Sequence, residues 1–292
     1  MAASSPIKIL APLRGVTIPA FREVFADAIR EYGFTEAITP FITANQGYDP
    51  LRDRELCGMT KVIPCQNQPC PLSITPQFIG KDPAALRYAL ERVKSAGFVH
   101  ADLNCGCPFP MVRNKGRGSG LLRTPEVLEA MIATGCEVMG PGNFSIKTRL
   151  GVEKKDELLK LMPIINRYPL RFLTVHPRTA KQMYEGEADL AAYREVAQTA
   201  AVPLILNGPG GEMIGRPFIR SLGERADAAS LLNRYIEVSK AELCGENPVL
   251  GRIKELLTYW KDLPRWSRRW DIIKMCRSLD ELKISLDFFR DL

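Results

Sequence analysis

The stretch DPAALRYALERVKSAGFVHADLN (residues 82–104) contains one predicted helix followed by one predicted strand, and this pairing indicates the fold. Asp82-Pro83 is a helix start signal, Gly97 is a stop signal, and FVHADLN (98–104) is typical of a buried strand. Short apolar runs and amphipathic helical patterns alternate in the same way on both sides of this stretch. Strands that alternate with helices at this interval predict a parallel sheet.

Further strands and helices are predicted outward from that stretch. Strands are expected at residues 7–12, 35–41, 72–80, 98–104, 144–150, 171–179 and 203–208, and helices at 18–33, 82–97, 124–139, 155–168 and 189–200. Seven such units before residue 210 favour a closed (β/α)8 TIM barrel over an open doubly wound sheet. After about residue 217 only helical patterns remain. We therefore expect a barrel domain over residues 1–219 and a small all-helical domain over residues 220–292.

The composition is that of a globular protein with an excess of positive charge. The chain has 292 residues and a net charge of +7, which fits an anionic partner without proving one. No run of eighteen apolar residues is present, and the first residues lack the pattern of a secretory signal. Eight cysteines without the spacing of a small disulfide scaffold indicate reduced thiols. These features predict a cytoplasmic protein with no membrane segment.

Polar residues recur where the predicted barrel strands end, and active sites of barrel enzymes lie there. A lysine on an apolar strand, such as Lys147, either extends its charged head to solvent or directs a cation into the barrel mouth. A single histidine is more often structural, but His176 precedes Arg178 at the same end as Lys147, which favours a functional role. The residues at these strand ends are Gln77, Asn104, Cys105, Cys107, Lys147, Arg149, His176, Arg178 and Asn207.

The pair Cys105 and Cys107 in NCGCP (104–108) has three competing interpretations. A zinc site requires two closely spaced pairs, and Cys57, Cys65 and Cys70 offer only a weak alternative. A disulfide is disfavoured in a reducing compartment. A thiol with an ordinary pKa of about 8.5 stays protonated at neutral pH and can act as a general acid. We expect Cys107 to be that acid, Cys105 to have a packing role, and no metal to be bound.

Three glycine-rich or basic segments are candidates for binding phosphate. NGPGG (207–211) with Arg216 offers backbone N–H groups and a cation late in the barrel, although such loops are also ordinary turns. In the simplest interpretation, VRNKGRGSG (112–120) is a surface loop and PRWSRRW (264–270) combines core tryptophans with surface arginines. Their functional interpretation is contact with an RNA backbone, with tryptophans available to stack on bases. The basic residues concerned are Arg113, Lys115, Arg117, Arg265, Arg268 and Arg269.

At this point the sequence resembles the tRNA-dihydrouridine synthase family, with matching motifs in order over roughly residues 7–220. The thiol segment and the segment that contains HPRT are the specific ones. The similar segments are LAPLRGVTIPAFR (10–22), LNCGCPFPMVRNKGRGSGLLRTPEVL (103–128), KTRLG (147–151), VHPRTAKQMYEGEADL (175–190), LILNG (204–208) and MIGRPFI (213–219).

The resemblance implies an FMN-bound barrel with a helical domain that grips tRNA, acting as a monomer. Reduced flavin would pass a hydride to C6 of a flipped-out uracil, Cys107 would protonate C5, and NADPH, with NADH as the alternative, would reload the flavin. It also implies that the phosphate-contacting cations above, together with Arg178, bind tRNA. The positions that match the family's flavin contacts are Pro12, Leu13, Arg14, Gln77, Asn104, Lys147, His176, Asn207, Gly208, Gly215 and Arg216.

Two departures from the family pattern have consequences. Ile18 stands where an acidic residue is usual, which we expect to affect local structure more than chemistry. Only PGGE separates NG from MIGR, where the family has a helix and the start of strand eight. Since a parallel crossover needs a dozen residues or more, strand eight is displaced, or the barrel is incomplete there, or the chain is an internally deleted variant.

Two alternatives to a tRNA-dihydrouridine synthase therefore stay open. One is a tRNA-binding paralogue whose catalysis is impaired by the missing segment. The other is an FMN barrel that reduces a small molecule, which leaves the basic helical tail unexplained.

Overall fold

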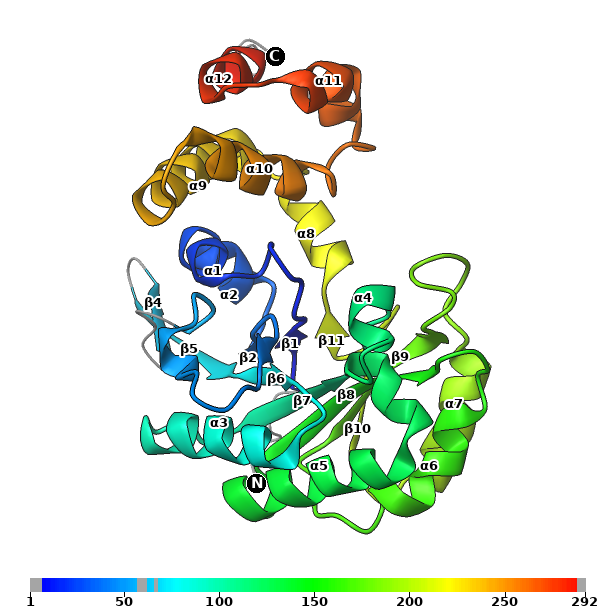
Figure 1. The fold of residues 1–292 in the computed structure, drawn as a ribbon. Helices are drawn as coiled ribbons and strands as arrows, with labels where there is room; N and C mark the ends of the chain where they lie inside the picture. The colour runs from blue at the N-terminus through cyan, green and yellow to red at the C-terminus, as the bar shows by residue number, and fades with distance from the viewer. Residues whose placement is uncertain (1–6, 57–61, 66–67, 288–292) are drawn as a thin grey trace.

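Eight parallel strands form most of a TIM barrel in the computed structural model, which describes residues 7–56, 62–65 and 68–287 (Figure 1). Most described residues of these strands are buried, as barrel strands that are covered by helices must be. The barrel strands are β1 (Ile9–Leu10), β2 (Glu36–Ile38), β5 (Gln68–Thr75) continued by β6 (Gln77–Ile79), β7 (Ala101–Cys105), β8 (Phe144–Gly151), β9 (Leu173–Thr179), β10 (Leu204–Leu206) and β11 (Met213–Ile214).

The strand order confirms the predicted α/β barrel class. The hydrogen-bonded orders are β11-β1-β2-β5-β4 and β10-β9-β8-β7-β6-β3, and the chain itself joins the two sheets where β5 passes through Pro76 into β6. All pairings between the barrel strands are parallel. Two accessory strands are β3 (Ile42–Thr43), parallel to β6, and β4 (Val62–Cys65), antiparallel to β5.

Amphipathic helices cover the outside of the barrel near their predicted positions. These are α3 (Pro83–Ser95), α5 (Pro125–Met139), α6 (Glu157–Ile165) and α7 (Leu190–Thr199). The single helix predicted over residues 18–33 is wrong, because the chain breaks at Phe25 into α1 (Pro19–Val24) and α2 (Ala26–Glu31). Ile18 is the N-cap of α1, makes no capping bond and is buried, so its effect is local, as expected.

The seam between β10 and β11 is where the barrel departs from full closure. β11 pairs with β1 and β10 pairs with β9, but no backbone ladder joins β10 to β11. Two side chains bridge the gap instead. The Glu212 carboxylate accepts the Leu206 N–H at 2.9 Å, and the Asn207 amide donates to the Met213 carbonyl at 3.0 Å. The expectation of an incomplete barrel near strands seven and eight is therefore confirmed.

The helices after β11 pack on the barrel through one continuous core. They are α8 (Arg216–Leu222), α9 (Ala228–Glu242), α10 (Glu246–Leu257), α11 (Pro264–Met275) and α12 (Leu279–Asp287). The Tyr235 ring of α9 meets the Phe21 and Phe25 rings of the barrel in edge contacts at 6.3 and 5.8 Å. The predicted boundary at residue 219 falls inside α8, which belongs to both parts.

Candidate functional site

The parallel register of the strands brings the predicted site residues to one end of the barrel. Asn104 on β7 pairs with Lys147 on β8, and Arg149, two residues later, pairs with His176 on β9. Residues two apart on a strand share a face. Lys147 and Arg149 therefore lie on one face of β8, next to the face that carries Asn104. The three strands lie side by side beneath the short helix α4 (Pro110–Arg113) in Figure 1.

A chain of buried hydrogen bonds fixes the backbone of Cys107. The Cys107 N–H donates to the Asn104 carboxamide oxygen at 2.9 Å, and the Asn104 amide group donates to the Gln77 oxygen at 2.9 Å. The Gln77 amide in turn donates to Asp102 at 2.7 Å, and Ser145 donates to the other oxygen of Asp102 at 2.7 Å. Every side chain in this chain is buried and has a partner, so the position of Cys107 is specified from within the barrel.

Burial keeps the Cys107 thiol protonated. Its residue is 7% exposed, and burial raises its pKa above the ordinary value, although the nearby cations Arg14, Arg149 and Lys147 oppose the shift. A protonated thiol at the mouth of the barrel is able to give a proton to a bound molecule. Cys105 points to the other side of β7 into the fully buried core, which agrees with a packing role.

The glycine-rich run after Cys107 folds back onto it. Ser119 donates both its hydroxyl and its N–H to the Cys107 carbonyl, at 2.8 and 3.2 Å. Gly118 has a φ of +57°, and a Cβ there would lie 2.8 Å from the Cys107 Cβ. A Cβ on Gly120 would overlap the Arg113 carbonyl. These glycines are therefore required by close packing around the cysteine.

Five cationic or basic side chains gather beside the thiol. Burial lowers the pKa of Lys147 to about 8, with a further contribution from Arg149. Burial also lowers the pKa of His176 far below its usual range, and four neighbouring cations lower it further. His176 is therefore neutral. Its Nε2 lies 3.0 Å from Arg178 Nη1 and must accept that bond, because arginine can only donate. The four cations near His176 are Lys147, Arg149, Arg178 and Arg216.

The carboxylate that acts on these cations is the buried Asp102, which opposes the lowering of the Lys147 pKa. Among the described residues, none of the four lies within 4.0 Å of an acidic side chain, although the rest of the surface carries many such pairs. The Tyr184 ring lies against two of them, at 4.5 Å from Arg216 and 5.2 Å from Arg149. A cluster of four cations without a carboxylate in ion-pair contact, inside a barrel mouth, is suited to holding an anion.

Arg149 was predicted at a strand end without a role, and Tyr184 was not predicted at all. The Arg149 side chain donates to the Gly106 carbonyl at 3.0 Å, and to the carbonyls of Thr179 and Met183 at 3.0 and 2.6 Å. It therefore ties the cysteine turn to the loop after β9. The KTRLG motif (147–151) was the available signal, but neither its arginine nor this tyrosine has a spacing that reveals such contacts.

The remaining predicted cofactor residues surround the same mouth. Pro12, Leu13 and Arg14 follow β1, in a turn closed by Thr17, whose hydroxyl accepts the Leu13 N–H at 2.8 Å. Gly215 lies against that turn, since a Cβ there would be 3.1 Å from the Ala11 Cβ. Asn207 and Gly208 belong to the seam after β10, so the part of the mouth predicted for phosphate lies where the barrel is open.

The predicted RNA contacts lie in two separate places. Arg113, Lys115 and Arg117 stand on and after α4, beside the cysteine turn. Arg265, Arg268 and Arg269 stand on α11, and the last two follow Trp266, which is only 1% exposed. The indole N–H of Trp266 donates to the Gly223 carbonyl, and that of Trp260 donates to the Ile219 carbonyl. The idea that Trp266 stacks on a base is therefore wrong, because its ring belongs to the core.

The comparison with known families decides what this barrel is. The family model described as dihydrouridine synthase matches residues 9–210, about two thirds of the chain, including the cysteine turn and most of the cation cluster. The chain belongs to the dihydrouridine synthase family. The matched segment ends within NGPGG (207–211), at the seam where the barrel departs from closure.

Individual relatives of the dihydrouridine synthase family extend this match. A tRNA-dihydrouridine synthase-like protein of Caenorhabditis elegans is 34% identical over 188 residues, which is 63% of this chain and 62% of the relative. The tRNA-dihydrouridine(16) synthase of Salmonella typhimurium is 28% identical over 203 residues, 68% and 64% of the two chains. The alignments thus span slightly less than two thirds of these two relatives. The tRNA-dihydrouridine(16) synthase of Haemophilus influenzae is 27% identical over 314 residues, 96% of this chain and 98% of the relative.

The described residues form neither a metal-binding cluster nor a membrane-spanning helix. In the described ranges there is no group of three or more His, Cys, Asp or Glu side chains arranged to hold a metal ion. Cys57 and the side chains of Cys65 and Cys70, the weak alternative ligands, lie outside the described part. The described helices include none that is long and apolar enough to span a membrane.

Proposed function

We propose that this dihydrouridine synthase reduces the C5=C6 bond of specific uridines in tRNA with bound FMN. The observation that carries the proposal is the position of the Cys107 thiol. It is protonated, it is fixed through Asn104, and it lies beside cations that form no ion pair within the described part of the chain. A proton donor next to an anion-binding mouth is what reduction of a base by an anionic cofactor requires.

The described residues fit FMN as an anionic cofactor. Lys147, Arg178 and Arg216 supply positive charge without a competing carboxylate, and neutral His176 adds a hydrogen-bonding imidazole. Gly208, Gly215 and Asn207 offer small or polar surfaces at the end where a phosphate would lie. When bound, reduced FMN supplies a hydride, and NADPH or NADH would restore it. We propose the nicotinamide cofactor on the family resemblance alone.

Each of the site residues then has a defined role in the reaction. Cys107 gives the proton that C5 of the uracil needs, and its thiolate recovers a proton from solvent. Asn104, held by Gln77, keeps the thiol at the mouth, and Arg149 keeps the turn of Gly106 closed. Lys147 and Arg178 stabilise negative charge near the acceptor. The α4 and α11 arginines contact the RNA backbone, with the chain acting as a cytoplasmic monomer.

The test is to measure dihydrouridine directly in tRNA. Unmodified tRNA is incubated with purified protein, FMN and NADPH, and dihydrouridine is quantified and mapped by mass spectrometry, with Cys107→Ala in parallel. We expect product at defined positions with the wild type only. Equal product from both proteins would remove Cys107 from the mechanism, and no product from either would remove the proposed activity.

A second function is favoured by the open seam between β10 and β11. If the seam prevents flavin binding, the protein is a tRNA-binding paralogue that does not catalyse reduction. A purified protein that is yellow, with an absorbance band near about 450 nm, supports the enzyme, because flavin carries the hydride chemistry. A colourless protein that takes up no added FMN and still binds tRNA supports the paralogue.

A further inference from the structure

A second pocket lies beside the cysteine site, and the proposed reaction does not use it. Its volume is about 330 Å³, and residues from β3, the loop after it and the β1 turn line it. Its lining includes two carboxylates, Asp53 and Glu55, whereas the neighbouring cation cluster has none. The two sites share Arg14, which lines the pocket and also lowers the pKa of the Cys107 thiol against the effect of burial.

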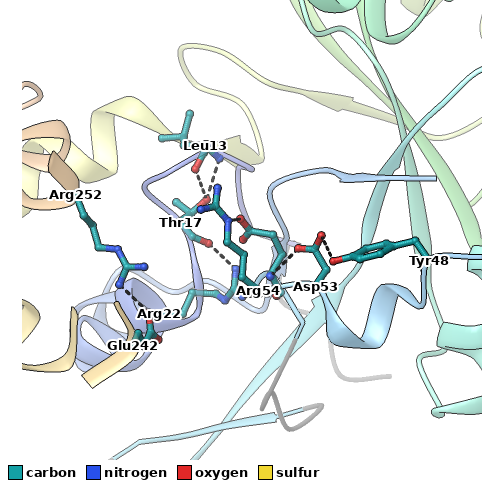
Figure 2. Close-up of polar contacts among 9 residues, drawn as sticks. Leu13, Thr17, Arg22, Tyr48, Asp53, Arg54, Glu242 and Arg252 are labelled. Atoms are coloured by element: carbon teal, nitrogen blue, oxygen red, sulfur yellow. Dashed lines mark hydrogen bonds and ion pairs between the residues drawn. The ribbon is translucent and has the colours of Figure 1, made fainter. Parts of the chain in front are cut away.

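The wall of the pocket is held in place by its own contacts. A 3₁₀ turn (Pro50–Arg52) is capped by Asp49, which Arg92 of α3 binds at 2.8 Å. Asp53 then accepts the N–H of Glu55 at 3.0 Å with one oxygen and the Tyr48 hydroxyl at 3.2 Å with the other. Figure 2 shows the Tyr48 hydroxyl directed at the Asp53 carboxylate. The Asp53 carboxylate and the backbone of Glu55 therefore occupy fixed positions.

Glu55 has a capacity for hydrogen bonding that the described residues leave unfilled. It is only 3% exposed, and its Oε2 is buried without a hydrogen-bond partner within the described part of the chain. Its nearest cation contact is 3.7 Å, from Oε1 to Arg54 Nε. Burial raises the pKa of Glu55 to about 7, although Arg22 and Arg54 oppose the shift. A buried carboxylate oxygen without a donor is destabilised, and a ligand that brings N–H groups would relieve this once the Glu55 side chain turns toward the pocket.

The pocket combines two carboxylates with two arginines, which favours a base edge that offers both donors and acceptors. Carboxylates accept hydrogen bonds from ring N–H and amino groups. Guanine presents a ring N–H and an amino group side by side, which match one carboxylate with two bonds. Its neighbouring edge carries the O6 and N7 acceptors that arginine binds in pairs, and Arg14 and Arg54 line the pocket. Arg14 lies 5.2 Å over the Phe41 ring and offers a flat surface for stacking.

The pocket also lies between the thiol and the helical domain. Glu255 of α10 is close to the β1 turn, since a Cβ on Gly15 would lie 2.4 Å from Glu255 Oε2. Burial raises the pKa of Glu255, and Arg54 and Arg14 oppose this shift. These arginines therefore lie close to the helical domain as well. A strand of RNA that runs from the helical domain to Cys107 would pass this pocket with the nucleotides next to its target.

We propose that this pocket binds a guanine base of the RNA substrate, within a few nucleotides of the uridine that is reduced. The pocket then contributes to the choice of uridine, because substrate choice in enzymes of flipped bases depends on contacts to flanking nucleotides. This proposal rests on the proposed function, since it assigns part of the specificity of the same site.

The experiment pairs a change in the RNA with a change in the protein. Guanosines within a few nucleotides of the reduced uridine are replaced one at a time by inosine, which lacks the amino group, in an otherwise unchanged tRNA. For the wild-type protein we expect kcat/KM to fall roughly tenfold at one position. For Glu55→Gln we expect a similar loss with the guanosine tRNA and no further loss with inosine at that position. Glu91→Gln, an exposed glutamate on α3, is the matched control and should behave like the wild type.

Two outcomes would overturn the proposal while leaving the enzyme intact. One is dihydrouridine formation at equal rates with every inosine tRNA, and the other is the same inosine loss in Glu55→Gln as in the wild type. Absence of dihydrouridine from all tRNAs would instead overturn the proposed function. If Glu55→Gln loses its flavin or its melting transition, Asn45→Ala on the exposed rim of the pocket takes its place, with the same expected loss of guanosine preference.

Discussion

The two sides of the barrel mouth are held together in different ways. On the β7–β8 side, a continuous ladder joins the strands, and the buried chain from Asp102 to Asn104 fixes Cys107. On the β10–β11 side, only the side chains of Glu212 and Asn207 bridge the strands. The first side carries the proposed proton donor, and the second carries the proposed phosphate site. Chemistry and cofactor retention should therefore respond to different substitutions.

The largest effect is expected at the proton donor. Cys107→Ala should lower dihydrouridine formation by about 10²–10⁴-fold, the usual contribution of a general acid, while flavin content stays unchanged. The measurement is single-turnover reduction of tRNA by the prereduced protein. The matched control is Cys105→Ala, which removes a buried thiol two residues away. It should lower the melting temperature and keep the activity of the folded protein. Equal catalytic losses in both variants would indicate a structural role for the whole turn.

Among substitutions in the seam between β10 and β11, we expect a substitution of Gly211 to have the largest effect on stability and FMN content. A Cβ at this position would lie 2.2 Å from the Leu206 carbonyl oxygen, so the loop must move away from β10 in Gly211→Ala. We expect a loss of roughly 1–3 kcal/mol of unfolding free energy, typical of overpacking, together with lower FMN content. Thermal melting and the flavin-to-protein absorbance ratio measure both.

The control for this substitution is Gly251→Ala in the middle of α10, where nothing lies within 4 Å of the added methyl group. Alanine is favoured over glycine by about 0.5–1 kcal/mol in a helix, so this variant should be slightly stabilised. A full complement of FMN in Gly211→Ala would show that the seam does not support the phosphate.

Most of the fold was predictable because each helix and strand has its own periodic pattern, and the short PGGE segment revealed the seam. The break at Phe25 was not predictable, because the rings of Phe21 and Phe25 pack on Tyr235, which is far away in sequence. The proposed roles of Cys107 and Asn104 followed from a recognisable motif. Asp102 gave no such signal, because its importance arises only from its bonds to Gln77 and Ser145.

Cofactor affinity should depend on pH through Lys147. Its pKa is lowered from 10.5 to about 8 in the unliganded fold, so binding of an anion above pH 8 must first restore its proton. FMN affinity should therefore fall above pH 8, by as much as about tenfold per pH unit, as linkage of one proton requires.

The same lowered pKa of Lys147 affects folding stability. The free energy of unfolding of the unliganded protein should rise as pH rises from 8 towards 10.5, because only the unfolded chain still binds the proton there.

Fluorescence titration of FMN between pH 7 and 9.5 checks this dependence, since the phosphate itself titrates near about 6. Lys147→Met should bind FMN more weakly and without the decline above pH 8. An identical decline in this variant would assign the titration to a group other than Lys147.

The smallest effect is expected on the helical domain, at the far end of the proposed RNA path. Arg268 on α11 is exposed, and Arg268→Ala should remove about one unit from the slope of log affinity against log salt concentration. Filter binding of tRNA at several salt concentrations measures that slope. Lys160→Ala on α6, on the outside of the barrel, removes one exposed positive charge away from the path and should leave the slope unchanged. If both variants lower the slope equally, tRNA binding depends on the net charge of +7 and not on the α11 arginines, and the helical domain does not guide the RNA to Cys107.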